Sequence, residues 1–220
     1  DKVNTAKNEQ TDTWFKGLDR VYNNFVYDYL YPNPASVLAF IENHDTDRFL
    51  GEGENLDMLK QASTLLLTTR RIPQLYYGTE VMMNGVKSKS DGYVRKDFPG
   101  GWADDKENAL TPEGRTRLQN ESYNFYRNLL NWRKGNDVIA KGSMKQFMVQ
   151  HGVYAYARQY KGKTVFVLLN GTDKEVKLPL KYYAEVLKDK TQGKDVISGK
   201  VTALNEELTM APRQSMVIEL

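Results

Sequence analysis

The chain has 220 residues, enough to bury a sizeable core in one large or two small domains. Hydrophobic residues at 40% and charged residues at 27% are ordinary for a globular protein, and the net charge of +3 comes from scattered Lys and Arg, which gives no indication of nucleic-acid binding. Its apolar runs are too short to span a bilayer, and the absence of cysteine excludes disulfides and thiolate chemistry. Because the chain begins at Asp1, we expect a processed or truncated piece of a longer protein.

The first half of the chain alternates a helical pattern with short apolar runs. Apolar residues three and four apart predict a helix over 13–30. The unbroken apolar run at 37–41 predicts a strand buried on both faces of a parallel sheet. A helix capped by Asp57 and a second strand over 72–77 follow. Strand, helix and strand in this order indicate a right-handed βαβ unit with parallel strands.

The middle of the chain contains a long polar stretch and then a further helix. Residues 84–110 are rich in Gly, Asp and Lys and are too long for a plain connector, which favours a functional loop. The sequence Thr111-Pro112 predicts a helix start, with Thr111 as the N-cap, and Gly135 predicts its end.

After Gly142 the hydrophobic period changes from helical to alternating. Apolar and polar residues alternate over 153–158 and again over 216–220, and residues 165–169 form an apolar run. Lys161-Gly162, which lies between 153–158 and 165–169, indicates a turn. Short strands separated by turns predict an antiparallel β-sandwich. We therefore expect a domain boundary near residue 141.

A cluster of polar side chains follows the predicted strand at 37–41 directly. Such groups at the carboxyl end of a buried parallel strand are typical of the active-site rim of a barrel or an open α/β sheet. The alternative is a polar loop that pairs with itself. The cluster consists of Glu42, Asn43, His44, Asp45, Asp47 and Arg48.

Two motifs in this region resemble a known family. The sequence F-I-E-N-H-D at 40–45 resembles the F-x-x-N-H-D signature after the seventh strand of the α-amylase family of glycoside hydrolases (glycoside hydrolase family 13). The sequence I-P-Q-L-Y-Y-G-T-E-V at 72–81 resembles the eighth-strand segment of the same family. The motifs H-D-T-D-R-F and R-K-D-F-P-G-G-W are most similar to enzymes of the neopullulanase and cyclomaltodextrinase type.

This resemblance implies a fold and a division into domains. It implies that residues 1–141 form the C-terminal portion of a (β/α)8 TIM barrel, with strands seven and eight and their flanking helices. Residues 142–220 would form the antiparallel β-sandwich domain that follows the barrel in this family. The expected fold class is therefore α/β plus all-β.

The resemblance also implies roles for individual residues. Asp45 matches the carboxylate that stabilises the transition state, and His44 matches the histidine that binds the same sugar. Asp91 and Arg95, four apart, match residues that bind glucose units on the donor side, and Trp102 is a candidate stacking residue. The alternatives are a surface ion pair for Asp91 and Arg95 and an aromatic staple for the loop.

The other members of the polar cluster are expected to support Asp45. Asn43 is expected to shape the turn, because asparagine tolerates unusual backbone angles. Glu42, Asp47 and Arg48 are expected to form ion pairs that hold the loop.

The implied activity is that of a retaining glycoside hydrolase on starch-type α-glucans such as maltodextrin, cyclodextrin or pullulan. Its nucleophilic Asp and acid Glu follow strands four and five in the family and would lie upstream of this chain, so we expect the chain alone to be inactive. Two alternatives stay open: an α-glucan transglycosylase, and a non-catalytic module that binds glycan or protein.

Cofactors and partners are less determined by the sequence. No metal-binding pattern is evident, and the resemblance implies that any Ca²⁺ is bound through residues upstream. The expected partner is an α-glucan, with no nucleic acid and no membrane. Exposed strand edges predict self-association or pairing with the missing N-terminal part. A periplasmic or secreted location is expected, with a cytoplasmic one left open.

Overall fold

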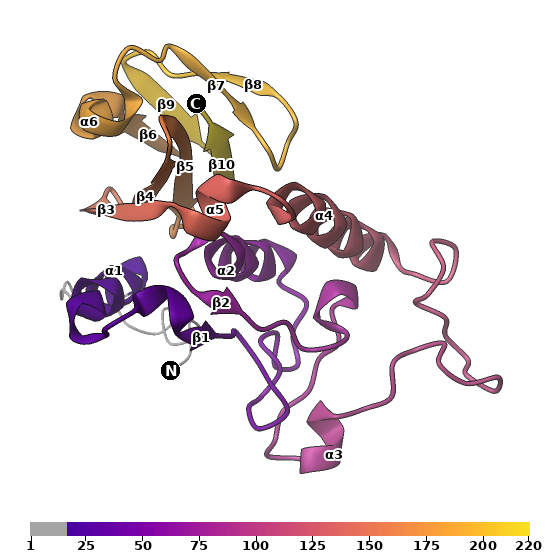
Figure 1. Ribbon diagram of the computed structural model, residues 1–220. Helices are drawn as coiled ribbons and strands as arrows, with labels where there is room; N and C mark the ends of the chain where they lie inside the picture. The colour runs from indigo at the N-terminus through magenta and orange to yellow at the C-terminus, as the bar shows by residue number, and fades with distance from the viewer. Residues whose placement is uncertain (1–16) are drawn as a thin grey trace. The chain divides into compact units, whose positions relative to one another are not determined.

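The computed structural model describes residues 17–220 (Figure 1). The chain divides into two compact units, each made of separate segments. None of the helices in residues 17–220 has the length and apolar character needed to cross a membrane. Among the described residues, the β-rich unit consists of 17–37, Thr68–Arg70 and Gly135–Leu220, and the α/β unit consists of Leu38–Leu67 and Arg71–Lys134.

The β-rich unit contains two antiparallel sheets, so the predicted antiparallel β-sandwich is confirmed (Figure 1). The larger sheet has six strands in the order β3-β4-β5-β10-β7-β8, and the smaller pairs β6 with β9. The strands are β3 (Ser143–Gln150), β4 (Val153–Tyr160), β5 (Lys163–Asn170), β6 (Val176–Pro179), β7 (Gln192–Asp195), β8 (Val201–Ala203), β9 (Glu207–Met210) and β10 (Ser215–Glu219).

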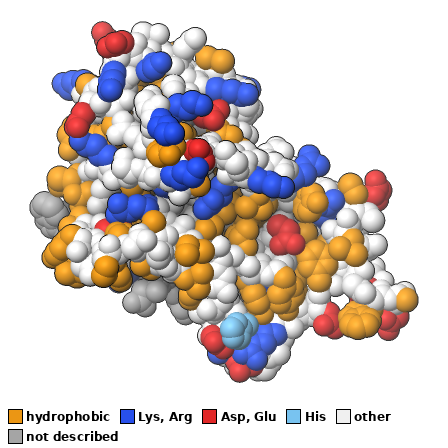
Figure 2. All heavy atoms as spheres, viewed as in Figure 1, with side chains coloured by type: hydrophobic (Ala, Val, Ile, Leu, Met, Phe, Trp, Pro, Cys, Tyr) orange, Lys and Arg blue, Asp and Glu red, His pale blue; other side chains and the backbone are white. Residues whose placement is uncertain are grey.

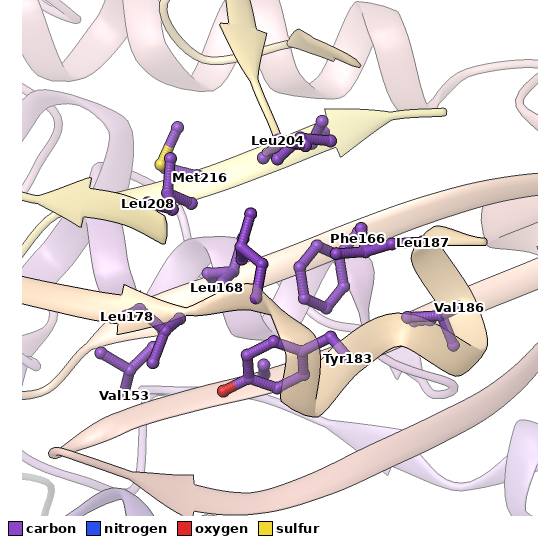
Figure 3. Close-up of a cluster of buried hydrophobic side chains, with 14 of the residues drawn as sticks. Val153, Phe166, Leu168, Leu178, Tyr183, Val186, Leu187, Leu204, Leu208 and Met216 are labelled. Carbon is purple, nitrogen blue, oxygen red and sulfur yellow. The ribbon is translucent and has the colours of Figure 1, made fainter. Parts of the chain in front are cut away.

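Alternate residues of these strands form the core of the β-rich unit (Figure 3). Val153, Phe166 and Met216 come from three neighbouring strands of the larger sheet, and Leu178 and Leu208 come from the smaller one. The period of two places every second side chain on one face, so the two sheets can bury a shared apolar layer. The 3₁₀ helix η5 (Leu180–Tyr183) and helix α6 (Ala184–Leu187) add Tyr183, Val186 and Leu187 to the core.

Two tight turns set the register of the first three strands. The predicted turn at Lys161-Gly162 is confirmed, with φ of 48° and 78°. His151-Gly152 has the same pattern, with φ of 52° and 77°. Two consecutive positive φ values match the twist of adjacent antiparallel strands, and glycine at the second position makes this conformation cheap.

Strand β4 is buried on both faces, although its alternating sequence is typical of a half-exposed strand. Its second face carries Tyr154, Tyr156 and Arg158, which are all fully buried. Helices α1 (Leu18–Val26) and α5 (Asp137–Lys141) pack against this strand. The chain therefore covers with helices the face that alternation alone assigns to solvent.

Arg158 is the most polar group of that buried face. Its guanidinium donates to the backbone carbonyls of Thr68, Ile139 and Gly142, each at 2.8 Å, and to that of Ser143 at 3.2 Å. The hydroxyl of Tyr156 also bonds to that of Thr68. Because a buried charge is tolerated only when its donors are paired, Arg158 joins three separate stretches of the unit.

The predicted helix at 13–30 is only partly realised. Its first residues lie outside the described part of the chain, and α1 ends at Val26 and continues as the 3₁₀ helix η2 (Tyr27–Leu30). A second 3₁₀ helix, η3 (Pro34–Ser36), begins at a proline. Helix α5 was not predicted, although Asn136 caps it through its side-chain oxygen, which accepts from the N–H of Val138 at 3.0 Å.

In the α/β unit, the predicted parallel pairing is confirmed. Strand β1 (Leu38–Ala39) pairs with β2 (Ile72–Pro73), with Leu38 opposite Ile72. Helix α2 (Leu56–Thr68) connects them, which gives the expected strand–helix–strand order. The described residues form this two-stranded parallel sheet and no closed barrel.

The strands are shorter and less buried than predicted. The predictions of strands over 37–41 and 72–77 are wrong in length, and burial on both faces is wrong as well, because Leu38, Phe40 and Ile72 are 54%, 43% and 49% exposed. Each strand has one neighbour among the described residues, so neither face receives the second layer that a parallel sheet needs.

Two helix caps differ from the predictions. Asn55, and not Asp57, caps α2 by accepting from the N–H of Met58 at 3.0 Å. Helix α4 (Arg117–Arg133) begins at a capping box of Thr116 and Gln119, so Thr111 is not its cap. The predicted end at Gly135 agrees with its φ of 80°. The 3₁₀ helix η4 (Thr79–Val81) and helix α3 (Asp91–Val94) complete the unit.

We predict that Arg158→Met lowers the free energy of unfolding of this chain by roughly 3 kcal/mol, because buried carbonyls lose their donors. Urea unfolding measures the effect. The exposed Lys177→Met is the matched control and should change stability by less than about 0.5 kcal/mol. Equal midpoints for the two variants would contradict a stabilising role for the Arg158 contacts.

Candidate functional site

The residues after β1 form a tight turn that exposes His44 and Asp45. The side-chain oxygen of Asn43 accepts from the N–H of Asp45 at 2.8 Å, which closes an Asx turn. The N–H of Asn43 donates to the hydroxyl of Thr46 at 3.1 Å. The side chain and the backbone N–H of Asn43 therefore both stabilise the turn that follows β1.

A buried ion pair joins the two ends of this turn. Glu42 and Arg48 are 2% and 1% exposed, and Arg48 Nη1 lies 3.1 Å from Glu42 Oε1. The second oxygen of Glu42 accepts from the N–H of Phe49 at 2.5 Å, and the hydroxyl of Thr79 donates to Oε1. The carboxylate thus has a cation and two further donors, which offset much of the cost of burying it.

Arg48 also connects the turn to the segments after β2. Its Nη1 donates to the carbonyl of Tyr77 at 2.7 Å, and its Nε donates to the carbonyl of Val94 at 3.1 Å. The guanidinium carbon lies 4.0 Å from the centroid of the Tyr76 ring, within the range of a cation–π contact. One side chain therefore holds three stretches of the α/β unit together.

Gly85 allows two of these stretches to approach closely. Its carbonyl accepts from the N–H of Arg48 at 3.0 Å, and its N–H donates to the carbonyl of Gly51 at 2.7 Å. A Cβ at this position would lie 2.5 Å from the carbonyl oxygen of Tyr93. Any other residue would push the backbone segments apart.

His44, Asp45 and Arg95 meet at the surface. His44 Nε2 lies 3.2 Å from Asp45 Oδ2, and Arg95 Nη2 donates to Asp45 Oδ1 at 3.2 Å. Arg95 Nε also donates to the carbonyl of His44 at 3.0 Å. The side chains of His44 and Asp45 are 58% and 63% exposed, so a ligand can reach both.

Asp91 lies next to this group, but its nearest cation is Lys87. Lys87 Nζ lies 3.1 Å from Asp91 Oδ1, whereas Arg95 Nη2 lies 4.0 Å from Asp91 Oδ2. The hydrogen bond from Lys87 is the largest cause that lowers the pKa of Asp91 below its ordinary value. The structure therefore brings together His44, Asp45, Asp91 and Arg95.

Sequence reasoning missed Lys87, although the signal was available. Lys87, Asp91 and Arg95 are spaced by four, so spacing alone allows Asp91 to pair in either direction. The backbone N–H of Lys87 also donates to Asp47 Oδ1 at 2.8 Å. Asp47 thus holds the long loop against the turn.

Trp102 stands apart from the cluster. Its side chain is 65% exposed and makes no hydrogen bond or ring contact within residues 17–220. Asp105 Oδ2 accepts from the N–H groups of Gly100 and Trp102 at 2.8 and 3.0 Å, so a local turn presents the ring. Tyr93 is different, because ammonium groups of Lys89 and Lys96 lie 4.5 and 3.8 Å from its centroid.

Residues 17–220 contain no group of three or more acidic, histidine or cysteine side chains close enough to hold a metal ion. The carboxylates of the exposed cluster instead pair with cations.

The cyclo-malto-dextrinase C-terminal domain family matches residues 144–219. An alpha-amylase from Niallia circulans is 28% identical over 93% of this chain and 36% of its own length. A cyclomaltodextrin glucanotransferase from Thermoanaerobacterium thermosulfurigenes is 32% identical over 77% of this chain and 21% of its own length. The chain thus spans only about a third or a fifth of these relatives.

A solved structure shows the same fold. The chain superimposes on an Anoxybacillus alpha-amylase with a TM-score of 0.73 and 19% identity, over 92% of this chain and 42% of that one.

We predict that Arg48→Met destabilises the chain by roughly 3–5 kcal/mol, because Glu42 is left buried without its cation. Thermal or urea unfolding measures the loss. The matched control is Arg117→Met, which removes the exposed ion pair with Glu121 and should cost less than about 0.5 kcal/mol. A loss from Arg48→Met as small as that of the control would refute the supporting role of the buried pair.

Proposed function

Because this chain belongs to the α-amylase family of glycoside hydrolases as its C-terminal part, we propose that it contributes one catalytic carboxylate to an enzyme acting on starch-type α-glucans. The observation that carries the proposal is the position of Asp45. It lies in the turn after β1, it is exposed, and it contacts His44 and Arg95. The alpha-amylase and glucanotransferase relatives support a starch-type substrate.

We further propose that β1 and β2 are the seventh and eighth strands of a (β/α)8 barrel completed by polypeptide outside this chain. Their parallel pairing supports this assignment, as does the match to an alpha-amylase structure over most of the chain. Hydrophobic side chains are widespread on the face shown in Figure 2. The exposed apolar residues near the two strands are Leu38, Phe40, Ile72, Leu75 and Tyr77, which further strands would cover.

In this proposal the barrel part extends over residues 1–141 and the β-sandwich domain over 142–220. The cyclo-malto-dextrinase C-terminal family match at 144–219 supports the range proposed for the β-sandwich domain. The proposed partners are an α-glucan and the remaining part of the barrel. Any calcium would be held outside this chain, and a periplasmic or secreted location is part of the same proposal.

Asp45 would act on the sugar ring at the cleaved bond. Each of its oxygens has one neighbouring nitrogen in the protein, His44 Nε2 beside Oδ2 and Arg95 Nη2 beside Oδ1, and a carboxylate oxygen can accept more than one hydrogen bond. Two sugar hydroxyls can therefore donate to it. These bonds strengthen as the ring becomes an oxocarbenium ion, whose positive charge the carboxylate also stabilises.

Asp91, Arg95 and Trp102 would bind glucose units on the donor side. A carboxylate and a guanidinium together offer acceptors and donors for neighbouring hydroxyls, and an exposed indole offers a stacking face. Arg95 has a second role, because it also contacts Asp45 and the carbonyl of His44. This arrangement links recognition of the donor glucan to the geometry of the catalytic carboxylate.

The nucleophile and the general acid would come from outside the chain. A retaining mechanism needs these two carboxyl groups about 5–5.5 Å apart across the cleaved bond, and Asp45 would be a third group beside them. Glu42, Asp47, Arg48 and Asn43 would hold the turn and would not touch the sugar.

Transglycosylation is the second candidate function. It is favoured by the relatives named cyclomaltodextrin glucanotransferase, which include the one that is 32% identical. The same site would serve, with a sugar hydroxyl in place of water as the acceptor. Product analysis with and without added acceptor sugar distinguishes the two, because only a transferase makes longer or cyclic products.

We predict that Asp45→Asn in the complete protein lowers kcat on maltooligosaccharides by about a hundredfold or more, because a transition-state interaction is lost. Steady-state kinetics measures the loss. Asp137→Asn is the matched control, since it neutralises an exposed carboxylate paired with Lys141 in the β-rich unit. Unchanged turnover in Asp45→Asn would remove Asp45 from the mechanism and would favour a non-catalytic binding module.

We also predict that the 220-residue chain alone does not hydrolyse maltooligosaccharides, because it would carry one catalytic carboxylate of three. Adding the upstream part of the protein should restore turnover if the two parts associate along the free edges of β1 and β2. Reducing-sugar release measures both outcomes. Turnover by the purified chain alone would refute this division of catalytic groups.

A further inference from the structure

Lys87 occupies a position in the α/β unit that the proposed function does not use. Its ammonium group lies 3.1 Å from Asp91 Oδ1 and donates to the backbone carbonyl of Asp45 at 3.2 Å. Its backbone N–H donates to Asp47. Lys87 thus contacts both the carboxylate assigned to the donor side and the backbone of the catalytic residue.

The four charged side chains around it alternate in sign. Lys87 pairs with Asp91, and Arg95 pairs with Asp45 at 3.2 Å. Asp91 and Arg95 are also four residues apart and are separated by 4.0 Å. Asp91 therefore has two cations within reach, and Lys87 holds the nearer contact.

Removal of Lys87 would change the pairing of Arg95. Without Lys87, Asp91 would have Arg95 as its nearest cation. The attraction between the two would draw Arg95 Nη2 toward Asp91 and away from Asp45 Oδ1. The pKa of Asp91 is lowered mainly by the hydrogen bond from Lys87, which agrees with Lys87 as its main partner.

We propose that Lys87 is a positioning residue, which occupies Asp91 so that Arg95 stays on Asp45 and orients its carboxylate toward the reacting sugar. The inference rests on the proposed function of Asp45. It assigns to Lys87 no contact with the sugar and no proton transfer. Its effect on the reaction passes through Arg95.

A double-mutant cycle tests this proposal in the complete protein. Lys87→Met keeps the length of the side chain and removes its charge, and it should lower kcat on maltoheptaose roughly fivefold with little change in KM. In an Asp91→Asn background the neutral side chain no longer competes for Arg95. There Lys87→Met should change kcat by less than about 1.5-fold. Lys87→Arg, which restores a cation, should return kcat to within about twofold of wild type.

The same loss in both backgrounds would overturn the proposal, because a purely structural role of Lys87 gives additive effects. No loss in the wild-type background would overturn it as well. Asp45→Asn, measured alongside, keeps the two hypotheses apart. If Asp45→Asn is inactive and Lys87→Met is fully active, the role of Lys87 fails and the proposed function stands. If Asp45→Asn is fully active, the proposed function fails.

A crystal structure of the Lys87→Met variant provides a readout that does not depend on activity. The separation of Arg95 Nη2 and Asp91 Oδ2 should fall from 4.0 Å into hydrogen-bond range, and the 3.2 Å contact with Asp45 Oδ1 should lengthen. An Arg95 side chain that stays on Asp45 in this variant would overturn the proposal.

Discussion

The buried ion pair between Glu42 and Arg48 is the interaction on which the α/β unit depends. Two charges removed from water are stable only when nearly all of their hydrogen-bonding groups find partners. That requirement forces the turn after β1, the segment after β2 and the end of α3 into one arrangement, because each supplies a partner to the pair. This buried contact therefore fixes the positions of the exposed residues between Glu42 and Arg48.

The surface group around Asp45 has the opposite character. Its side chains are exposed, their charges alternate in sign, and each carboxylate oxygen retains capacity for another hydrogen bond. A sugar presents neutral hydroxyls, so a site with balanced charges and unused acceptors suits it. Rigidity comes from the buried pair and binding capacity from the exposed group, and Asp45 lies in the sequence between the two members of the buried pair.

Sequence reasoning was most successful where local patterns determine structure. Alternation and the Lys161-Gly162 turn predicted the antiparallel sandwich, and two apolar runs around a helix predicted the parallel pairing of β1 with β2. The capping box at Thr116 was equally readable and was overlooked. Its four-residue signature spans the N-cap Thr116 and the first helical residues up to Gln119, whereas Thr111-Pro112 belongs to the preceding turn.

The candidate site could be predicted only in part. The motif around Asp45 identified the turn. The contact between Asp45 and Arg95, however, depends on how the loop that carries Arg95 folds back onto the turn, and no local rule contains that information. Spacing by four predicted an ion pair between Asp91 and Arg95, whereas in the structure the nearer cation to Asp91 is Lys87, at the same spacing. The exposure of Leu38 and Ile72 was also beyond local reasoning, since burial depends on neighbouring strands and not on the run itself.

The segmented make-up of the β-rich unit limits how the protein can be cut. The chain passes between the two units at 37/38, 67/68, 70/71 and 134/135, so no single cleavage releases the β-rich unit with all of its segments. A fragment starting at residue 142 would keep Arg158 but lose the carbonyls of Thr68 and Ile139 and the helix α1 that covers β4. Proteolysis that leaves only this fragment would therefore expose the aromatic face of β4 to solvent, and the fragment would be prone to aggregate.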